Sequence, residues 1–300
     1  MPELPEVESI RLQLEKYLVG HKIEKVEAHY KNFEGNGQNL VGGRVKKVRR
    51  FGKVLAIDLD NGYSAVIHIK LTGQLIYRGL NLPSPASLSK KVIGGIPGLP
   101  ANASQVRAGK HTHVTFELDK EGALYYNDVR RFGWIKIVET GKVTEIGFIK
   151  KLGPEPLVAK SSSGQAVLTL SLFEEILSKS GRPIKILLMD QEKIGGVGNI
   201  YANDALWLAG ISPRRPASSL SSRETKTLYE AILKVLKDGL KYGGSSELAY
   251  VTPDGKEGSY QDHTLAYGKD GEPCERCHKA TFKKFFLGGR GTYFCPACQK

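Results

Sequence analysis

Four cysteines near the end of the chain have the spacing of a metal site. Cys274 and Cys277 form one Cys-x-x-Cys pair, and Cys295 and Cys298 form a second pair after a gap of 17 residues. Each pair is a tight turn that presents two sulfurs to one ion, as in structural Zn²⁺ sites. Two disulfides or four free thiols are the alternatives, but the basic composition and the lack of a signal peptide disfavour disulfides. We therefore predict a zinc finger in which all four cysteines bind one structural Zn²⁺.

The N-terminus offers a candidate nucleophile. Met1 precedes the small residue Pro2, a context in which the initiator methionine is normally removed. Removal would leave a secondary α-amine, whose pKa near ~8 keeps a useful fraction neutral at pH 7. Glu3 is the neighbouring residue and can shuttle a proton, and Glu6 lies one helical turn further on. The alternative is that the two glutamates only complement the positive end of a helix dipole.

Three further stretches have the composition of polyanion-binding sites: 44–53, 127–134 and 195–202. The first holds six cations in ten residues, and its Lys53 starts an apolar run, although such a stretch is usually a solvated edge strand. The second places two arginines beside Phe132, which suits phosphate binding and a wedge into stacked bases, unless Phe132 is simply core. The glycines of the third precede a helix, where free backbone N–H groups hold phosphate. None of the three is decisive alone.

The overall charge favours a nucleic-acid partner. Among 300 residues, 44 Lys and Arg outnumber 31 Asp and Glu, which gives a net charge of +13. An excess of this size suits binding to a polyanion, although a basic solvated surface is the alternative. With 40% hydrophobic and 25% charged residues the chain is of globular type, and no stretch reaches the ~18 apolar residues of a membrane span. We expect a soluble, cytoplasmic, monomeric protein.

The pattern of apolar residues changes near residue 150. Before it we predict a helix at 4–18 and then short strands with turns between them, which is typical of a β-sandwich; the strands are expected at 22–28, 54–59, 64–71, 112–118, 123–126 and 134–138. After it helices dominate, at 170–180, 182–189, 198–210 and 221–242. Residues 79–110 and 153–166 lack such patterns and are expected to be a surface loop and a linker.

Together these segments resemble the formamidopyrimidine-DNA glycosylase / endonuclease VIII family of base-excision-repair enzymes. The resemblance spans the whole chain and rests on residues 2–8, 52–53, 110–113, 127–133, 152–157, 196–201 and 290–295, in family order. It implies an α+β protein: an N-terminal β-sandwich with an N-terminal helix, a helix-two-turn-helix domain and the four-cysteine finger. The expected divisions are 1–152 for the catalytic domain, 153–168 for the linker, 169–264 for the helix-two-turn-helix domain with a lesion-capping loop, and 265–300 for the finger.

The resemblance also implies a role for each site residue. Pro2 would be the nucleophile at C1′ of the damaged nucleotide, Glu3 the proton donor and acceptor, Lys53 a proton donor during β-elimination, and Arg290 one during δ-elimination. DNA would lie in a cleft between the domains with the target nucleotide flipped out. The positions that match DNA-contacting residues are His111, Arg130, Arg131, Lys185, Asn199 and Tyr201. Leu71, Arg130 and Phe132 would fill the space that the flipped nucleotide leaves.

The partner implied is double-stranded DNA that contains oxidised bases or abasic sites. Residues 243–260 resemble the capping loop of the branch that removes oxidised purines, such as 8-oxoguanine and formamidopyrimidines. The endonuclease VIII branch, which removes oxidised pyrimidines, and a non-catalytic zinc-finger DNA-binding protein are the alternatives. Three features depart from the family pattern: Leu71 stands where many relatives have Met, loop 79–110 is long, and the gap between the cysteine pairs differs slightly from the common spacing.

Overall fold

The computed structural model describes residues 1–79, 82, 109–157, 166–247 and 249–300. The expected loop 79–110 and the middle of the expected linker 153–166 therefore lie outside the described residues. The contacts divide the chain into two units. The first contains Met1–Lys150 and Tyr242–Gln261, and the second contains residues 151–157, 166–241 and Asp262–Lys300. Each unit is described here by itself.

The first unit begins with helix α1 (Leu4–Leu18), at the predicted bounds. The apolar residues that recur at helical spacing are all buried, because they form the face that packs on the sheets. A capping box opens the helix, in which the side chain of Glu6 and the backbone of Glu3 bond each other, with Pro5 in the first turn. The extended Val19 ends the helix, and Gly20 follows in a left-handed conformation.

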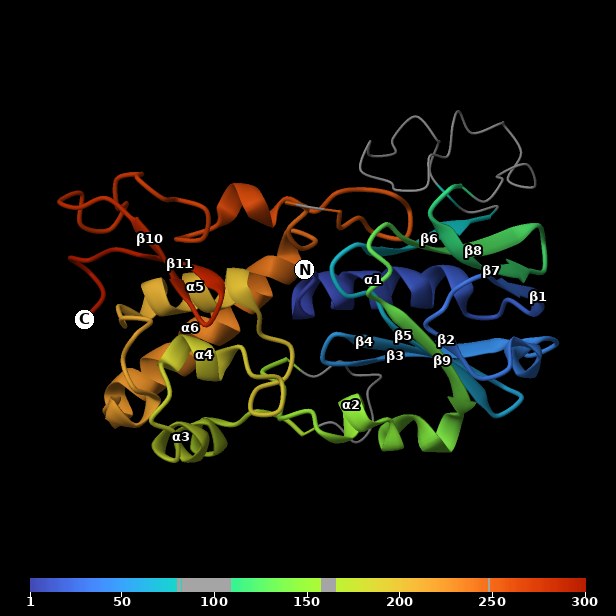
Figure 1. The fold of residues 1–300 in the computed structure, drawn as a ribbon, viewed down its shortest axis with the longest axis horizontal. Helices are drawn as coiled ribbons and strands as arrows, with labels where there is room; N and C mark the ends of the chain where they lie inside the picture. Colours follow the sequence, from blue (N-terminus) through green and yellow to red (C-terminus); the bar gives the residue numbers. More distant parts are fainter. Residues whose placement is uncertain (80–81, 83–108, 158–165, 248) are drawn as a thin grey trace. The chain divides into compact units, whose positions relative to one another are not determined.

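Two sheets follow α1 and form the predicted β-sandwich (Figure 1). In spatial order, the five-stranded sheet contains β2 (Phe33–Glu34), β9 (Trp134–Glu139), β5 (Tyr63–His68), β4 (Val54–Leu59) and β3 (Val45–Phe51). The four-stranded sheet contains β1 (Ile23–Ala28), β7 (Thr112–Leu118), β8 (Gly122–Asp128) and β6 (Gly73–Arg78). Side chains from both sheets and from α1 share one core. Helix α1 packs on β3 and β4 of one sheet and on β6 of the other.

The first unit also contains three short elements: the 3₁₀ turns η1 (Gly37–Leu40) and η4 (Thr140–Glu145) and the short helix α2 (Gly147–Lys150).

The strand predicted at 64–71 is shorter than expected, since β5 ends at His68 and Lys70 takes a φ of 51°. Strand β6 was not predicted. Both of its faces are buried, so its sequence lacks the alternation that identifies a half-exposed strand.

Residues 242–261 belong to the first unit, whereas the sequence-based division placed them with the helical domain. Their backbone bonds explain the difference: Tyr77 N donates to Pro253 O at 2.9 Å, and Gln74 Nε2 donates to Ala249 O at 2.5 Å. Tyr250 and Val251 are buried there, and burial of their apolar surface stabilises the packing of the segment on this unit. Strand β6 is thereby covered on its outer face.

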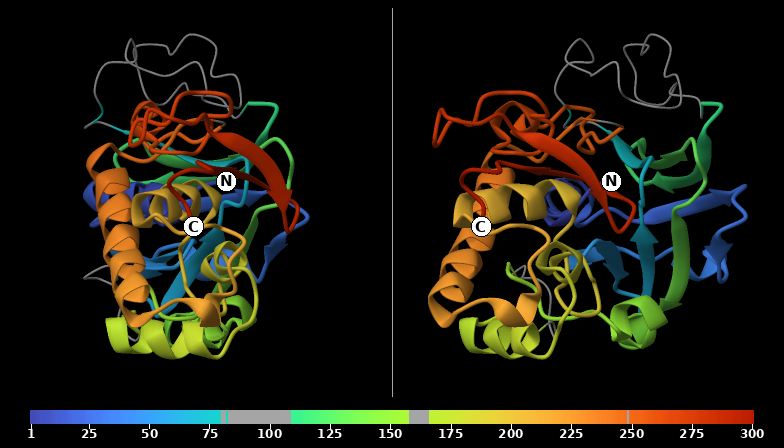
Figure 2. Two further views of the ribbon diagram at one scale, coloured as in Figure 1. Left: turned by 90° about the vertical axis from the view of Figure 1, so that its left-hand side faces the viewer. Right: turned by 60° about the vertical axis from the view of Figure 1, so that its left-hand side comes forward.

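The second unit is helical. It contains α3 (Leu170–Ser178), α4 (Ile184–Leu188), α5 (Asn199–Ala209), η5 (Ala217–Ser219) and α6 (Ser222–Lys241), and then the hairpin of β10 (Lys283–Leu287) and β11 (Arg290–Phe294). The turn η6 (Tyr260–His263) lies at the junction of the two units. Helix α6 packs on α3 and α5, and β11 lies against α5 (Figure 2). The predicted capping box of α6 is present, with Ser221 N donating to Glu224 Oε2 at 2.8 Å. Within the described ranges, no helix is long and apolar enough to cross a membrane.

Candidate nucleic-acid interface and metal centre

The first turn of α1 holds the N-terminal residues in a fixed place. Glu3 N donates to Glu6 Oε2 at 2.7 Å, and the other oxygen of Glu6 accepts Ser245 N at 2.8 Å. One buried carboxylate thus fixes the start of the helix and one end of segment 242–261. Pro2 and Glu3 are buried, whereas Met1 is 43% exposed. Glu6 is therefore the side chain that orients the backbone next to Pro2.

A buried ion pair links α1 to the turn that carries Lys53. Glu8 of α1 accepts Arg50 Nε at 2.7 Å, and its second oxygen accepts Arg11 Nε at 2.9 Å. Arg50 Nη1 also donates to Gly52 O at 3.0 Å. Gly52 has a φ of 56°, a conformation that favours glycine, and it turns the chain from β3 into β4 just before Lys53. Arg50 thus holds the Lys53 turn against the helix that begins at Pro2.

The stretch 44–53 is therefore only partly the solvated edge that such a charge run usually indicates. Strand β3 is an edge strand, and Lys46 and Lys47 are exposed. Arg50, however, is 1% exposed, and Arg49 Nη2 donates to the buried Asp58 Oδ1 at 2.9 Å. Both arginines neutralise carboxylates of this unit, so they add little to a phosphate-binding surface.

His68 marks the end of the sheet at which two lysines meet. Burial lowers the pKa of His68 well below its usual value, and the charges of Lys70 and Lys53 lower it further. The ring is therefore neutral at pH 7, and its Nδ1 accepts Lys70 N at 3.0 Å. Burial also lowers the pKa of Lys70. Lys53 and Lys70 thus lie close to the same histidine. Lys70 directly precedes Leu71 in the chain.

Asp128 joins two turns at this end of the unit. Its Oδ1 accepts Thr72 Oγ1 at 2.5 Å and Arg130 N at 3.2 Å, and its Oδ2 accepts Gly133 N at 2.9 Å and Tyr30 OH at 3.1 Å. Burial raises the pKa of Tyr30 to about 12, so its phenol remains a donor. Asp128 is fully buried, so these bonds replace its hydration. They hold the turn after β5 beside the turn after β8.

These two turns display the side chains that the resemblance assigns to the wedge. Leu71 lies on the first turn, and Arg130 and Phe132 lie on the second. Phe132 is 56% exposed, and the Arg130 guanidinium lies 4.8 Å from its ring centroid. His111 is close by, since its carbonyl accepts Asp128 N at 3.0 Å. An exposed ring beside a cation can stack on bases while the cation binds phosphate.

In the second unit, glycine turns place Asn199 at the start of α5. Gln191 shapes these turns, because its Oε1 accepts Gly196 N at 3.0 Å and its Nε2 donates to Val197 O at 2.8 Å. Gly196 has a φ of 91°, which a larger residue rarely adopts. Asn199 Nδ2 then donates to Gly291 O at 3.1 Å, so the start of α5 contacts the hairpin.

The hairpin presents Arg290 at its tip. Gly288 and Gly289 have φ values of 56° and 73°, as a two-residue hairpin turn of the primed type requires. Arg290 follows directly and is exposed, next to the Gly291 carbonyl that Asn199 binds. The structure therefore places Asn199 beside the residue that follows Arg290.

Lys185 and Tyr201, two of the residues expected to contact DNA, are buried inside the second unit. Lys185 is buried, and its Nζ donates to Gly291 O and to Thr292 Oγ1, both at 2.8 Å. Tyr201 is fully buried as well, and its ring lies against Gly239 of α6. In this structure the two side chains support the hairpin and the helices. Arg131 is exposed and takes a left-handed φ of 56°.

The four cysteines meet in one cluster. Their sulfurs all lie within 4.8 Å of one another, and the pairs Cys274–Cys298 and Cys277–Cys295 are 3.7 Å apart. A disulfide needs about 2.05 Å, so none is formed. Four sulfurs around one ion at about 2.3 Å would be about 3.8 Å apart, which agrees with the observed spacing. The cluster can therefore hold a metal ion with all four positions filled by protein.

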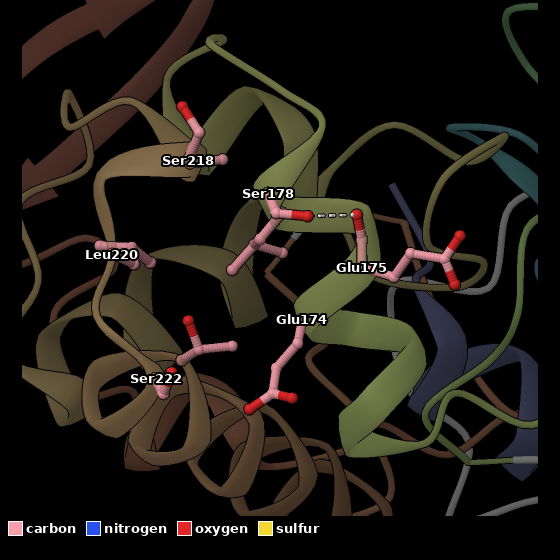
Figure 3. A pocket seen from close by; sticks show the side chains of 9 residues that line it. Glu174, Glu175, Ser178, Ser218, Leu220 and Ser222 are labelled. Carbon is pink, nitrogen blue, oxygen red and sulfur yellow. Dashed lines mark hydrogen bonds between the residues drawn. The ribbon is translucent and has the colours of Figure 1, made fainter.

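The two pockets beside α3 contain none of these residues. Figure 3 shows one of them, with Glu174, Glu175 and several serines around it. The other is lined in part by Lys179, Arg182 and Lys193. Lys179 and Arg182 are paired with Glu175 and Asp190 at 2.6 and 2.7 Å. We assign no chemistry to either pocket.

Comparison with known proteins decides the family. The model of the formamidopyrimidine-DNA glycosylase N-terminal domain matches residues 1–135, and the model of the H2TH domain of the same enzymes matches residues 152–250. The chain belongs to the formamidopyrimidine-DNA glycosylase family. It is 35% identical over 305 residues to the formamidopyrimidine-DNA glycosylase of Lactiplantibacillus plantarum, with all of both chains covered. It is 36% identical to that of Desulforamulus reducens, with 100% of this chain and 99% of the relative covered.

Solved structures of this glycosylase family have the same fold. A complex of Lactococcus lactis Fpg with DNA that contains an abasic site matches with a TM-score of 0.80 and 33% identity, and 99% of each chain is covered. A complex of a mutant of the same protein with DNA that contains Fapy-dG matches with the same TM-score and identity over all of both chains. The expected α+β fold, with a four-cysteine cluster in position for a zinc finger, is confirmed.

Sequence reasoning missed the residues that hold this glycosylase site together. Asp128 lies inside a stretch that was singled out, yet only its neighbours were assigned a role. Glu8 likewise belongs to the N-terminal motif, and its partner Arg50 was counted as one cation of a surface run. The available signal was that each motif contains a carboxylate, Glu8 or Asp128, to which no catalytic or DNA-binding role was assigned. Such a residue is a candidate for a buried partner of the functional side chains.

Proposed function

We propose that this protein is a bifunctional base-excision-repair enzyme: a DNA glycosylase that removes oxidised purines, such as 8-oxoguanine and formamidopyrimidines, and an AP lyase that then cleaves the strand. The observation that carries the proposal is the match to one enzyme family over the full length of the chain. The chemistry is assigned to Pro2, Glu3, Lys53 and Arg290, the residues at the family's motif positions. The enzyme acts as a monomer.

Pro2 starts the reaction. After removal of Met1, its amine attacks C1′ of the lesion nucleotide, and the bond from C1′ to the base breaks. The base leaves with a proton, and a covalent bond joins the Pro2 nitrogen to the sugar. Glu3 passes a proton to the sugar ring oxygen as the ring opens to the Schiff base. The bonds from Glu6 support this role, because they fix the backbone beside the nucleophile.

Strand cleavage follows by elimination from the Schiff base. Lys53 donates a proton to the DNA in the β-elimination, and Arg290 does so in the δ-elimination. The Glu8–Arg50–Gly52 bonds support the first role, since they hold the Lys53 turn against α1. The two-glycine turn supports the second, since it leaves Arg290 exposed at the hairpin tip.

Double-stranded DNA with oxidised bases or abasic sites is the proposed substrate. Leu71, Arg130 and Phe132 fill the space of the flipped nucleotide, and a long apolar Leu71 serves in place of Met. His111, Arg131 and Asn199 contact the backbone. The net charge of +13 supports a large contribution from phosphate contacts, which weakens as salt rises.

The metal of the four-cysteine cluster is proposed to be one Zn²⁺. Four thiolates are the donor set of structural zinc sites, and the 3.7 Å sulfur spacings fit a tetrahedron. When bound, the ion crosslinks the finger and takes no part in the reaction, because no coordination position stays open. Thiolates of this kind need a reducing compartment, which supports a cytoplasmic location.

A nicking assay on defined duplexes tests the function. We expect cleavage of duplexes that carry 8-oxoguanine, weaker cleavage of those with thymine glycol, and none of undamaged DNA. Preferred cleavage of thymine glycol would favour oxidised pyrimidines as the substrate. Binding without cleavage of either lesion would favour a non-catalytic DNA-binding protein.

Borohydride trapping tests the nucleophile. Intact mass should show a chain without Met1, and reduction during turnover should attach lesion DNA to the N-terminal peptide. Glu3→Gln should bind DNA normally but release little base. An adduct on Lys53 in place of Pro2 would overturn the assignment.

A further inference from the structure

One face of α5 carries the contacts that hold the finger. Asn199, Asn203 and Trp207 are spaced by four residues, so they lie in one row along the helix. Asn199 Nδ2 donates to Gly291 O at 3.1 Å, and Asn203 Oδ1 accepts Tyr293 N at 2.8 Å. The first two members of the row thus bind the backbone of β11.

Trp207, the third member of the row, has a buried polar atom that these contacts do not satisfy. The ring is 7% exposed, and its Nε1 has no hydrogen-bond partner in the part of the chain that is described. A buried N–H without an acceptor is rare, because it has lost its hydrogen bonds to water and gained none in return. The sulfurs of Cys274 and Cys295, in the same buried cluster, are the candidate acceptors.

Trp207 packs in the same buried cluster as Cys274. Trp207, Cys274, Cys295 and Phe282 form one buried cluster, with the Trp207 and Phe282 ring centroids 6.1 Å apart. Arg276, inside the first cysteine pair, lies 4.4 Å from the Trp207 ring centroid and donates to Leu208 O at 3.0 Å. Burial opposes ionisation of Cys274, whereas the Cys277 backbone and the nearby Trp207 side chain lower the pKa of its thiol.

A hydrogen bond from Trp207 to the cysteines would help to balance the charge of the metal site. Four thiolates and one Zn²⁺ carry a net charge of −2, and Cys274 and Cys295 are fully buried. A buried negative charge needs hydrogen-bond donors, and N–H groups that point at the sulfurs serve this purpose in metal sites. Cys277 and Cys298 are partly exposed, so their sulfurs can accept hydrogen bonds from water. Cys274 and Cys295 therefore depend on donors from the protein.

We propose that the Trp207 indole N–H donates a hydrogen bond to the metal-bound thiolate of Cys274, and that Trp207 is a positioning residue for the zinc finger. The inference rests on the metal centre of the proposed function. The hydrogen bond joins the metal site to the helix that starts at Asn199. One helix thereby sets the place of the metal and of the hairpin that carries Arg290.

The direct test uses the full-length protein with ¹¹³Cd as the bound metal. The chain has two tryptophans, so a Trp134→Phe background leaves a single indole N–H signal, that of Trp207. We expect a scalar coupling between this proton and ¹¹³Cd, which passes through the N–H···S hydrogen bond. Bound ¹¹³Cd with a four-sulfur chemical shift and no coupling would overturn the inference and leave the metal site intact. Failure to bind ¹¹³Cd would overturn both.

A second test measures metal affinity by competition with a chromogenic chelator. Trp207→Phe keeps a ring but removes the N–H, and we expect zinc affinity to fall roughly 10- to 100-fold. Trp134→Phe, the same change in the other unit, is the matched control and should keep the native affinity. Equal affinities for the two variants would contradict a role for the indole N–H. The ¹¹³Cd measurement needs no change at Trp207, so it decides the matter even if Trp207→Phe does not fold.

Discussion

The two units position their candidate functional side chains by different means. In the first, buried carboxylates do so: Asp128 holds the turns of Leu71 and Phe132, and Glu8 holds the turn of Lys53 through Arg50. In the second, the hairpin of Arg290 is held by the cysteine cluster and by bonds to α5.

The sizes of the buried apolar clusters beside the two sites explain this difference. The sandwich buries side chains from two sheets and a helix, so it can support the desolvation of a few charges that are fully bonded. The buried cluster around the cysteines contains only Trp207, Ala266 and Phe282 besides Cys274 and Cys295. A cluster this small needs a crosslink, and a metal ion bound by the four cysteines would supply one. A protein can thus order a loop with charge where its core is large and with metal where it is small.

Removal of the crosslink should have the largest effect. Cys298→Ser leaves three thiolates, and we expect loss of zinc, for which the binding free energy is on the order of 10 kcal/mol in peptide models. DNA binding should be lost, while the sandwich stays folded. Metal analysis, a binding assay and Trp134 fluorescence during urea unfolding measure the three outcomes. Full lesion cleavage by a zinc-free preparation would show that the hairpin is ordered without metal.

Disruption of a buried ion pair in the sandwich should have the next largest effect. Arg50→Met removes the ion pair with Glu8 and the hydrogen bond to the Gly52 carbonyl, and loss of one partner of a buried pair costs about 3–5 kcal/mol. We expect a lower urea midpoint for the first unit and slower strand cleavage at abasic sites. Arg44→Met is the matched control, since the Arg44 side chain is 51% exposed. Equal midpoints for the two variants would mean that the pair does not hold the Lys53 turn.

The sequence predicted the elements more completely than the bonds between them. Helix 4–18 was predicted to the residue, because its apolar spacing and capping residues are local signals. Strand β6 was missed because residues 249–256 cover its outer face, and no local pattern reveals a cover that comes from far along the chain. Arg50 illustrates the same limit, since its partner Glu8 is 42 positions away.

The candidate site divides in the same way. The cysteine spacing gave the metal cluster outright, and the family motifs gave Pro2, Asn199 and Arg290 as candidates. Lys185 and Tyr201 are buried against the hairpin and α6, and only three-dimensional contacts reveal such burial. The roles of all the candidate residues stay predictions.

Removal of the exposed wedge should have a moderate effect on activity and little on stability. Phe132→Ala removes a ring that the Asp128 network displays, and stacking is worth about 1–3 kcal/mol per base. We expect lesion excision to slow roughly 10- to 100-fold in duplex DNA and much less in single-stranded DNA, where no opposite base needs support. Phe286→Ala is the control, because Phe286 is 74% exposed and lies on the finger. Equal losses on both substrates would argue against a wedge.

The smallest effect is expected at the N-terminal cap of α6. The Glu224 carboxylate there is only partly buried, and it does not belong to the four-cysteine cluster. The Arg215 side chain and the Ser221 backbone lower the pKa of Glu224 to about 2. This pKa is below the unfolded value near ~4.3, so the carboxylate stabilises the second unit above pH ~4.3, and the stabilisation is lost as pH falls toward 2. Its side chain is 36% exposed, so solvent screens the pair and the contribution stays below about 1 kcal/mol.

Glu224→Gln should therefore lower the urea midpoint of the second unit slightly at pH 7, and the difference from the parent should shrink as pH falls below 4. Trp207 fluorescence in the Trp134→Phe background reports this unit alone. Glu230→Gln changes the same residue type on the same helix, at a position with no ion pair among the described residues, and should shift the midpoint less. A difference that grows toward low pH would reverse the sign of the argument. A loss as large as that of Arg50→Met would show that a half-exposed pair can matter as much as a buried one, and the contrast between the two units would then not rest on burial.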